Sequence, residues 1–248
     1  MDLHFLGTTG YHPNETRHTA CMMIPELGLV LDAGTGMFRV GPLLETETLE
    51  IFLTHAHLDH SMGLTFLFDI LHGRSINTVR VYGEGAKLKA LEEHLFSPLL
   101  FPIKPPCDFR PHSGDHRELL KGGVVKWFPL EHPGGSLGYR VDAQGKKLAY
   151  VTDTTASPTA EYVNAIRGVD VLVHECYFPD GEEERAALTG HSCSTPVAEV
   201  AKAAGVGQLY LVHINPLDEE GSAIHVDQMR KIFPETHVAT DGMVTSIG

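Results

Sequence analysis

The stretch Leu49–Gly63, LEIFLTHAHLDHSMG, places three histidines and one aspartate within six residues. These four residues are His55, His57, Asp59 and His60. An apolar run over Leu49–Thr54 predicts a buried strand that leads directly into them. Neutral imidazoles and carboxylates are good ligands for zinc, manganese or iron(II), and in a turn after a strand they can surround two metal ions. The stretch therefore predicts a metal centre at the end of a strand.

Strands and helices alternate along the rest of the chain. Apolar, β-rich runs predict strands at Asp2–Leu6, Thr19–Ile24, Leu27–Leu31, Leu49–Thr54, Thr78–Tyr82, Val124–Leu130, Leu137–Val141, Lys147–Val151, Val169–Val173, Gln208–Val212 and His237–Ala239. Helical patterns are expected at about Ser61–Leu71, Ala86–Phe96, Thr159–Ile166, Thr195–Ala204 and Val226–Ile232. Because the strand-then-helix order occurs twice, in residues 1–120 and 121–248, we expect one α/β sandwich domain over residues 1–248 with two similar halves.

Three other expected strands also end in side chains that bind metals. The run VVKWFPLEH ends in His132, KLAYVTD ends in Asp153 and QLYLVH ends in His213. Open α/β sheets carry their sites at the carboxyl ends of their strands. We therefore expect these three side chains to meet the histidine cluster.

The segment Pro98–Arg117 holds five prolines and shows no clear period. We expect a long surface loop, and because loops of this length usually have a role, it is a candidate lid or substrate wall over the site.

Composition narrows the class of protein. The 248 residues carry 19 Lys and Arg against 32 Asp and Glu, a formal net charge of −13, which disfavours nucleic-acid phosphates unless cations reverse the local field. No apolar run long enough to span a membrane and no signal peptide are found, and the four cysteines form no C-x-x-C pair. These features favour a cytoplasmic protein with reduced thiols that does not act at a membrane.

The H-x-H-x-D-H pattern at a strand end resembles that of the metallo-β-lactamase superfamily. Residues 29–36 also look like the family's strand ending in Asp-x-Gly, and the later strand ends match its remaining ligands. The resemblance implies a four-layer αββα sandwich with two pseudo-similar halves, and two divalent ions, zinc by default with manganese or iron left open. It implies one site of His55, His57 and His132, another of Asp59, His60 and His213, and a bridging Asp153.

Within that superfamily the chain resembles ribonuclease Z and its phosphodiesterase relatives. The segment His132–Arg140 resembles their H-x-x-x-S-x-G-Y-R, and Val171–Glu175 resembles their strand ending in His-Glu. By this match His191 is the extra catalytic histidine of phosphodiesterases, which would protonate the leaving oxygen or stabilise charge on phosphorus. Glu175 would orient His191 or a metal-bound imidazole.

Two neighbours of the expected ligands are assigned supporting roles. Asp32 is expected to accept a hydrogen bond from a metal-bound imidazole. His174 is expected either to orient His191 or a metal-bound imidazole, as Glu175 would, or to be a structural histidine.

The resemblance implies a dinuclear phosphodiesterase that cleaves a small or cyclic phosphodiester with a hydroxide bridging the metals, Asp59 being able to accept a proton. Two departures disfavour tRNA: no Gly/Pro-rich arm lies between Tyr150 and His191, and residues 215–218 (Asn-Pro-Leu-Asp) replace the family's Ser-x-Arg-Tyr. The alternatives are a ribonuclease Z-like tRNA 3′-end endonuclease, a lactone, thioester or sulfate-ester hydrolase, and a non-catalytic binding protein. A homodimer is implied only by the resemblance.

Overall fold

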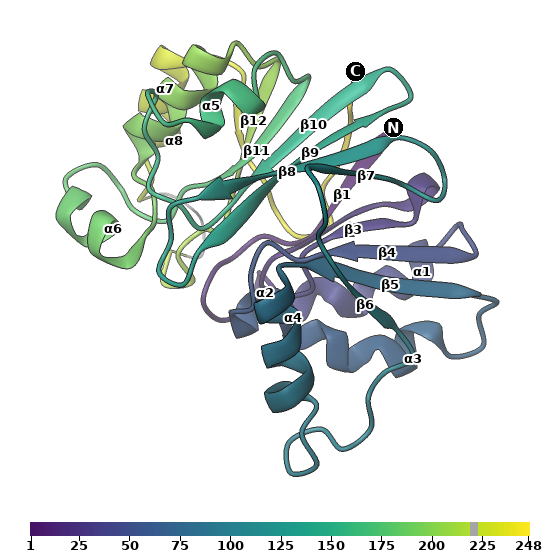
Figure 1. Cartoon of the computed structure of the whole chain (residues 1–248). Coiled ribbons are helices and arrows are strands. Elements are labelled where there is room, and N and C mark those ends of the chain that lie inside the picture. The colour runs from purple at the N-terminus through teal and green to yellow at the C-terminus, as the bar shows by residue number, and fades with distance from the viewer. Residues whose placement is uncertain (219–222) are drawn as a thin grey trace.

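The strand β10 (Lys146–Val151) shows why this chain forms layers. Leu148 and Tyr150 pack into one apolar cluster, and the alternate residues Ala149 and Val151 pack into another. Successive side chains of a strand point to opposite faces, so a strand that is apolar on both faces must be covered on both. In the computed structural model, which describes residues 1–218 and 223–248, two facing sheets carry helices on their outer sides (Figure 1).

The first sheet has seven strands in the order β14-β1-β2-β3-β4-β5-β6. They are β1 (Asp2–Gly7), β2 (Cys21–Ile24), β3 (Leu29–Leu31), β4 (Thr48–Phe52), β5 (Thr78–Gly83), β6 (Asp108–Pro111) and β14 (Val244–Ser246). The pairs from β14 to β3 are antiparallel and those from β3 to β6 are parallel.

The second sheet repeats this pattern in the order β7-β8-β9-β10-β11-β12-β13. Besides β10, its strands are β7 (His116–Glu118), β8 (Val124–Leu130), β9 (Ser136–Ala143), β11 (Val171–Glu175), β12 (Gln208–Val212) and β13 (Thr236–Val238). The pairs from β7 to β10 are antiparallel and those from β10 to β13 are parallel. The sandwich with two pseudo-similar halves is therefore confirmed.

Helices cover the outer face of each sheet. The first half carries α1 (Val40–Leu43), α2 (Leu58–Ser61), α3 (Leu67–Leu71) and α4 (Gly85–Ala90). The second half carries α5 (Tyr162–Ala165), α6 (Glu183–Thr189), α7 (Ser194–Ala204) and α8 (Val226–Ile232). Figure 1 shows α5, α7 and α8 over the second sheet and α1 and α3 beside the first. Within the described residues, no helix has the length and apolarity that crossing a membrane requires.

The boundary between the halves differs from the predicted one. β7 lies before residue 121 but pairs with β8 of the second sheet, and the C-terminal β14 pairs with β1 of the first. Each half thus lends one short edge strand to the other sheet. The two halves expected at residues 1–120 and 121–248 therefore do not coincide with the two sheets at these edge strands.

The helix expected at Ser61–Leu71 is broken into pieces. The chain forms α2, then a 3₁₀ segment at Met62–Phe66, then α3. The reason is a close approach: a Cβ on Gly63 would lie 2.2 Å from the carbonyl oxygen of Gly34. The tightened segment lets the backbone pass against the loop after β3, which brings α2 up to the ends of the strands.

Candidate metal centre

Every predicted ligand follows the carboxyl end of a strand. His55, His57, Asp59 and His60 lie between the end of β4 and the end of α2, while His132, Asp153 and His213 follow β8, β10 and β12. The structure brings them together as two groups, each with ligand atoms within 4.8 Å of one another. The first ligand group is His55, His57 and His132, joined by Asp153, and the second ligand group is Asp59, His60 and His213.

Asp153 stands between the two groups. Its Oδ2 lies 3.5 Å from His55 Nε2 and 3.6 Å from His132 Nε2, both in the first group. Its Oδ1 lies 3.2 Å from His60 Nε2 and 3.3 Å from His213 Nε2, both in the second group. Each oxygen therefore faces one group, which is the arrangement a bridging carboxylate needs.

The spacing of these atoms fits divalent metal ions better than direct hydrogen bonds. Two ligands about 2.1 Å from one tetrahedral zinc lie about 3.4 Å apart. His132 Nε2 and His57 Nδ1 are 3.4 Å apart, and Asp59 Oδ2 lies 3.4 Å from Nε2 of both His60 and His213. The buried Nε2 atoms of His55, His60 and His213 have no hydrogen-bond partner among the described residues. Because buried polar atoms are costly when unpaired, these nitrogens fit the role of metal ligands.

Asp32 holds the second group from behind. Its Oδ2 lies 2.8 Å from His60 Nδ1 and accepts a hydrogen bond from Tyr150 Oη at 2.9 Å, while its Oδ1 accepts one from the Thr54 backbone at 2.8 Å. Burial lowers the pKa of His60, but the carboxylates of Asp153, Asp59 and Asp32 outweigh it and raise that pKa well above its ordinary value. The expected role of Asp32 as an acceptor behind a ligand agrees with this geometry.

Strained backbone accompanies the site. Asp32, Asp153 and His213 have φ angles of 59°, 51° and 55°, which lie in the left-handed region that non-glycine residues seldom adopt. Each follows a strand end, where the chain turns sharply and points its side chain inward. Gly10 leaves room for the His213 ring of the second group, because a Cβ at position 10 would lie 2.1 Å from His213 Cε1. Such strain is typical of functional sites.

The first group is held differently. His132 Nδ1 lies 3.0 Å from the carbonyl oxygen of Gly190, and His55 Nδ1 lies 3.0 Å from Thr54 Oγ1. Burial lowers the pKa of His55, His57 and His132, and the neutral imidazole is the form that binds a metal ion. His57 is exposed and lines the pocket described below.

His191 lies beside both groups and is bound to Glu175. Its Nδ1 is 3.1 Å from Glu175 Oε1, and its ring centroid is 5.3 Å from that of His132 and 5.1 Å from that of His213. Burial lowers the pKa of His191, but the charge and hydrogen bond of Glu175 outweigh it and raise the pKa to about 9. Glu175 is itself fixed by the Thr154 backbone, which donates to Oε1 at 2.7 Å.

Both ring nitrogens of His174 are bonded to groups other than the ligands. Its Nδ1 lies 2.7 Å from the Glu175 carbonyl oxygen and its Nε2 lies 3.0 Å from Tyr162 Oη, in a fully buried position. Of the two roles left open for it, the geometry favours the structural one.

A pocket of about 330 Å³ opens over the metal-ligand atoms. Six of its lining residues were not predicted as site residues: Tyr11, Pro133, Tyr177, Phe178, Arg185 and Thr189. The pair at 177–178 follows the end of β11, so the strand-end rule could have indicated it. Arg185 and Thr189 belong to α6, which the sequence pattern did not reveal.

The prediction that Pro98–Arg117 forms a lid or wall over the site was wrong. None of its residues is among those that line the pocket, within the part of the chain that the structure describes. The segment contains β6 and the start of β7 instead, and the ring of Phe101 packs near those of Phe96 and Phe68. The strand β6 ends in Pro111 at a sheet edge, where a missing N–H is tolerated.

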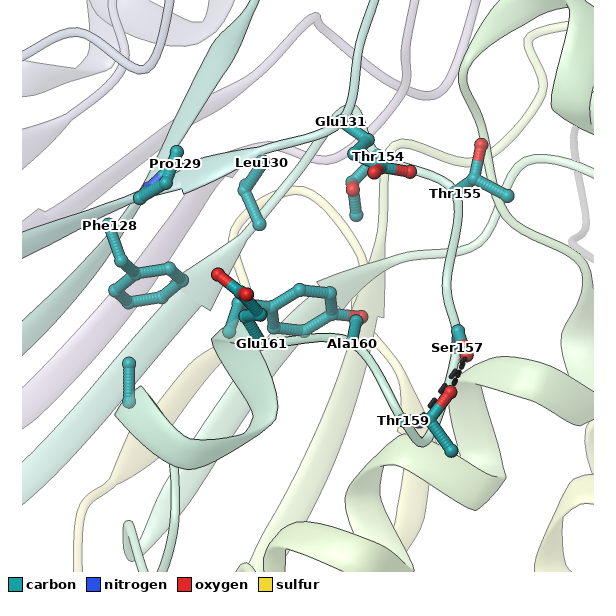
Figure 2. Close-up of a pocket in the computed structure, with 12 residues that line it drawn as sticks. Phe128, Pro129, Leu130, Glu131, Thr154, Thr155, Ser157, Thr159, Ala160 and Glu161 are labelled. Atoms are coloured by element: carbon teal, nitrogen blue, oxygen red, sulfur yellow. Dashed lines mark hydrogen bonds between the residues drawn. The ribbon is translucent and has the colours of Figure 1, made fainter.

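A larger cavity of about 730 Å³ lies next to the centre but holds none of its ligands (Figure 2). Glu131 and Thr154, which line it, are the chain neighbours of His132 and Asp153. Figure 2 shows Glu161 and the Ser157–Thr159 hydrogen bond on its other side. Its charged lining is acidic, so it is unsuited to a phosphate.

Known proteins resemble the chain over its whole length. The model of a β-lactamase superfamily domain matches residues 29–214. Ribonuclease Z of Metallosphaera sedula is 30% identical, covering 97% of each chain. The crystal structure of the short form of human tRNase Z superposes with a TM-score of 0.76 at 23% identity, covering 100% of both chains. A diphosphatase from the PhnP family gives 0.75 at 20% identity, covering 99% of this chain and 97% of the other.

Proposed function

The chain belongs to the metallo-β-lactamase superfamily, in its ribonuclease Z-like branch, and we propose that it is a dinuclear phosphodiesterase that acts on a small or cyclic phosphodiester. The superfamily supports the coarser statement that the protein is a hydrolase with divalent metal ions, and the His/Asp cluster fits such ions. The two-ion centre, zinc as its metal and the diester substrate are the finer parts of the proposal.

One observation carries the proposal: the two oxygens of Asp153 face two separate ligand groups, and His191 stands beside both. Two ions that share a carboxylate are the usual device for cleaving phosphate esters. The pocket of about 330 Å³ suits a ligand of nucleotide size or smaller.

The chain's own residues would divide the work as follows. When bound, the two ions would supply an activated water and neutralise charge on the phosphoryl oxygens. His191, protonated and fixed through Nδ1 by Glu175, would use Nε2 to donate a proton to the leaving oxygen. Asp59 receives the Tyr11 backbone N–H at Oδ2, at 2.8 Å, and its carboxylate would accept a proton from the attacking water.

The test is turnover of bis-p-nitrophenyl phosphate by the zinc-loaded protein. We expect His191→Ala to lower kcat by about 10²- to 10³-fold, as for the loss of one donor that stabilises charge in the transition state, since p-nitrophenolate leaves with little need of a proton. His116→Ala, on the exposed strand β7, is the matched control and is expected to keep wild-type turnover. A zinc-loaded wild-type protein that leaves this diester intact and opens lactones would overturn the proposal.

A tRNA 3′-end endonuclease is the second candidate, favoured by the 30% identity to a ribonuclease Z. The net charge of −13 weighs against a long polyanion lying across the surface. Processing of a tRNA precursor at a rate well above that of small diesters would favour this candidate.

A further inference from the structure

The pocket over the metal centre has two chemically different walls. One wall consists of the ligands and His191, and the other of Tyr11, Tyr177, Phe178 and Arg185. Arg185 is the only lining side chain, among the described residues, with a permanent positive charge. On a protein with a net charge of −13, a cation at the pocket over the metal centre points to an anionic ligand.

The Arg185 guanidinium contributes little to the stability of the fold. Its side chain is 67% exposed, and its ion pair with the half-exposed Glu182 spans 3.9 Å. Exposed pairs at that distance contribute little to stability. Arg140, by contrast, bonds both the Asp142 carboxylate and the Ala165 carbonyl oxygen. The charge of Arg185 therefore remains available to a ligand.

Aromatic rings fix this charge near the reacting centre. The guanidinium carbon of Arg185 lies 5.4 Å from the ring centroid of Phe178. The ring of Tyr177 stacks on His191 with centroids 5.0 Å apart and an interplanar angle of 21°.

Tyr11 belongs to the same wall of the pocket as Arg185. It is 75% exposed, it holds a left-handed φ of 62°, and its backbone N–H donates to the ligand Asp59. A large exposed ring on strained backbone, tied to a metal ligand, is typical of a contact for substrate.

We propose that Arg185 forms a subsite for a second phosphate of the substrate, so that the preferred substrates are small phosphodiesters that also carry a phosphate monoester. A guanidinium matches a phosphate with two parallel hydrogen bonds, and the pocket has room for one nucleotide-sized molecule. This inference rests on the proposed function, because it assumes that the scissile diester lies at the metal ligands.

The test compares two chromogenic substrates that differ by one phosphate: thymidine 5′-(p-nitrophenyl phosphate) with and without a 3′-phosphate. We expect the wild type to prefer the 3′-phosphorylated ester about tenfold in kcat/KM, as for one charge-assisted contact. Arg185→Gln should bring this ratio to about one, and Arg185→Lys should keep part of it. Arg110→Gln, an exposed arginine of β6 paired with Asp108, should leave the ratio unchanged.

Binding of the products gives a readout that does not require turnover. Calorimetry on the zinc-loaded protein should show thymidine 3′,5′-bisphosphate binding about tenfold tighter than thymidine 5′-monophosphate, and Arg185→Gln should remove the difference. Equal kcat/KM for the two esters in the wild type, or a preference that survives in Arg185→Gln, would overturn the subsite. Arg185-dependent binding of the bisphosphate without hydrolysis of either ester would support the subsite and overturn the proposed function.

Discussion

The two ligand groups of the metal centre are held by different means. In the second ligand group, His60 and His213 are buried, and His60 is anchored by Asp32, itself buried and bonded to Tyr150. In the first ligand group, His57 is exposed and His132 is held by a backbone carbonyl oxygen. Each group contributes two ligands to the pocket, His57 and His132 from the first and Asp59 and His213 from the second, so the groups differ in the support behind them. The difference teaches that one centre can combine a site anchored by a buried carboxylate with a site held by neutral oxygen acceptors.

The largest effect should come from removing one imidazole of each group in the metal-free protein. His60→Ala leaves Asp32 buried beside other carboxylates without its partner, so we expect a loss of about 3–5 kcal/mol in the free energy of unfolding. His57→Ala removes an exposed ring and should change it by no more than about 0.5 kcal/mol. Urea unfolding measures both, and equal losses would contradict the distinction between the groups.

Two glycine substitutions should separate the groups by metal content. A Cβ on Gly10 would meet the His213 ring, whereas a Cβ on Gly190 would lie 2.8 Å from His132 Nδ1 and 2.4 Å from Pro133 Cδ. Gly10→Ala should therefore empty the second group and Gly190→Ala the first, each variant losing about one zinc per chain and about 1–3 kcal/mol through crowding.

The control for these variants is Gly85→Ala. A Cβ at Gly85 meets only ordinary contacts at 3.6 Å, so zinc content and stability should stay at the wild-type level. Retention of both zinc ions by Gly10→Ala would show that His213 does not depend on the close approach of Gly10.

The smallest effect is a pH dependence of the free energy of unfolding that arises outside both ligand groups. Burial lowers the pKa of His112 from 6.5 to about 4, in a position stacked on Trp127. Between these pH values the unfolded chain binds a proton that the folded chain does not, so stability falls as pH falls. From pH 7 to pH 5.5 we expect a loss of about 1 kcal/mol that His112→Gln removes, after allowance for solvent screening. An identical pH slope in the variant would contradict this, and the comparison of the groups should be made at pH 7 or above.

The sequence indicated the candidate ligands because their signal is local. A metal-binding side chain directly after an apolar strand needs no knowledge of the rest of the fold, and His55, His132, Asp153 and His213 all follow that rule. The resemblance to ribonuclease Z then indicated His191 and Glu175, which the structure places in contact.

Features that depend on tertiary contacts were missed for a physical reason. β6 and β14 are short, largely exposed strands without apolar alternation, and only their pairing at a sheet edge makes them strands. The helix after β4 is broken by the close approach of Gly63 to another loop. α6 has a single buried residue, Ala186, so its sequence shows no apolar face, and Arg185 was missed with it.

The central claim is that the two ligand groups bind two ions that together support hydrolysis of a phosphodiester. The most direct measurement is titration of the metal-free protein with zinc while turnover of bis-p-nitrophenyl phosphate is recorded. Our account predicts that turnover appears on zinc addition and saturates at two zinc ions per chain. A protein that binds no zinc, or that binds two zinc ions and leaves the diester intact, would contradict it.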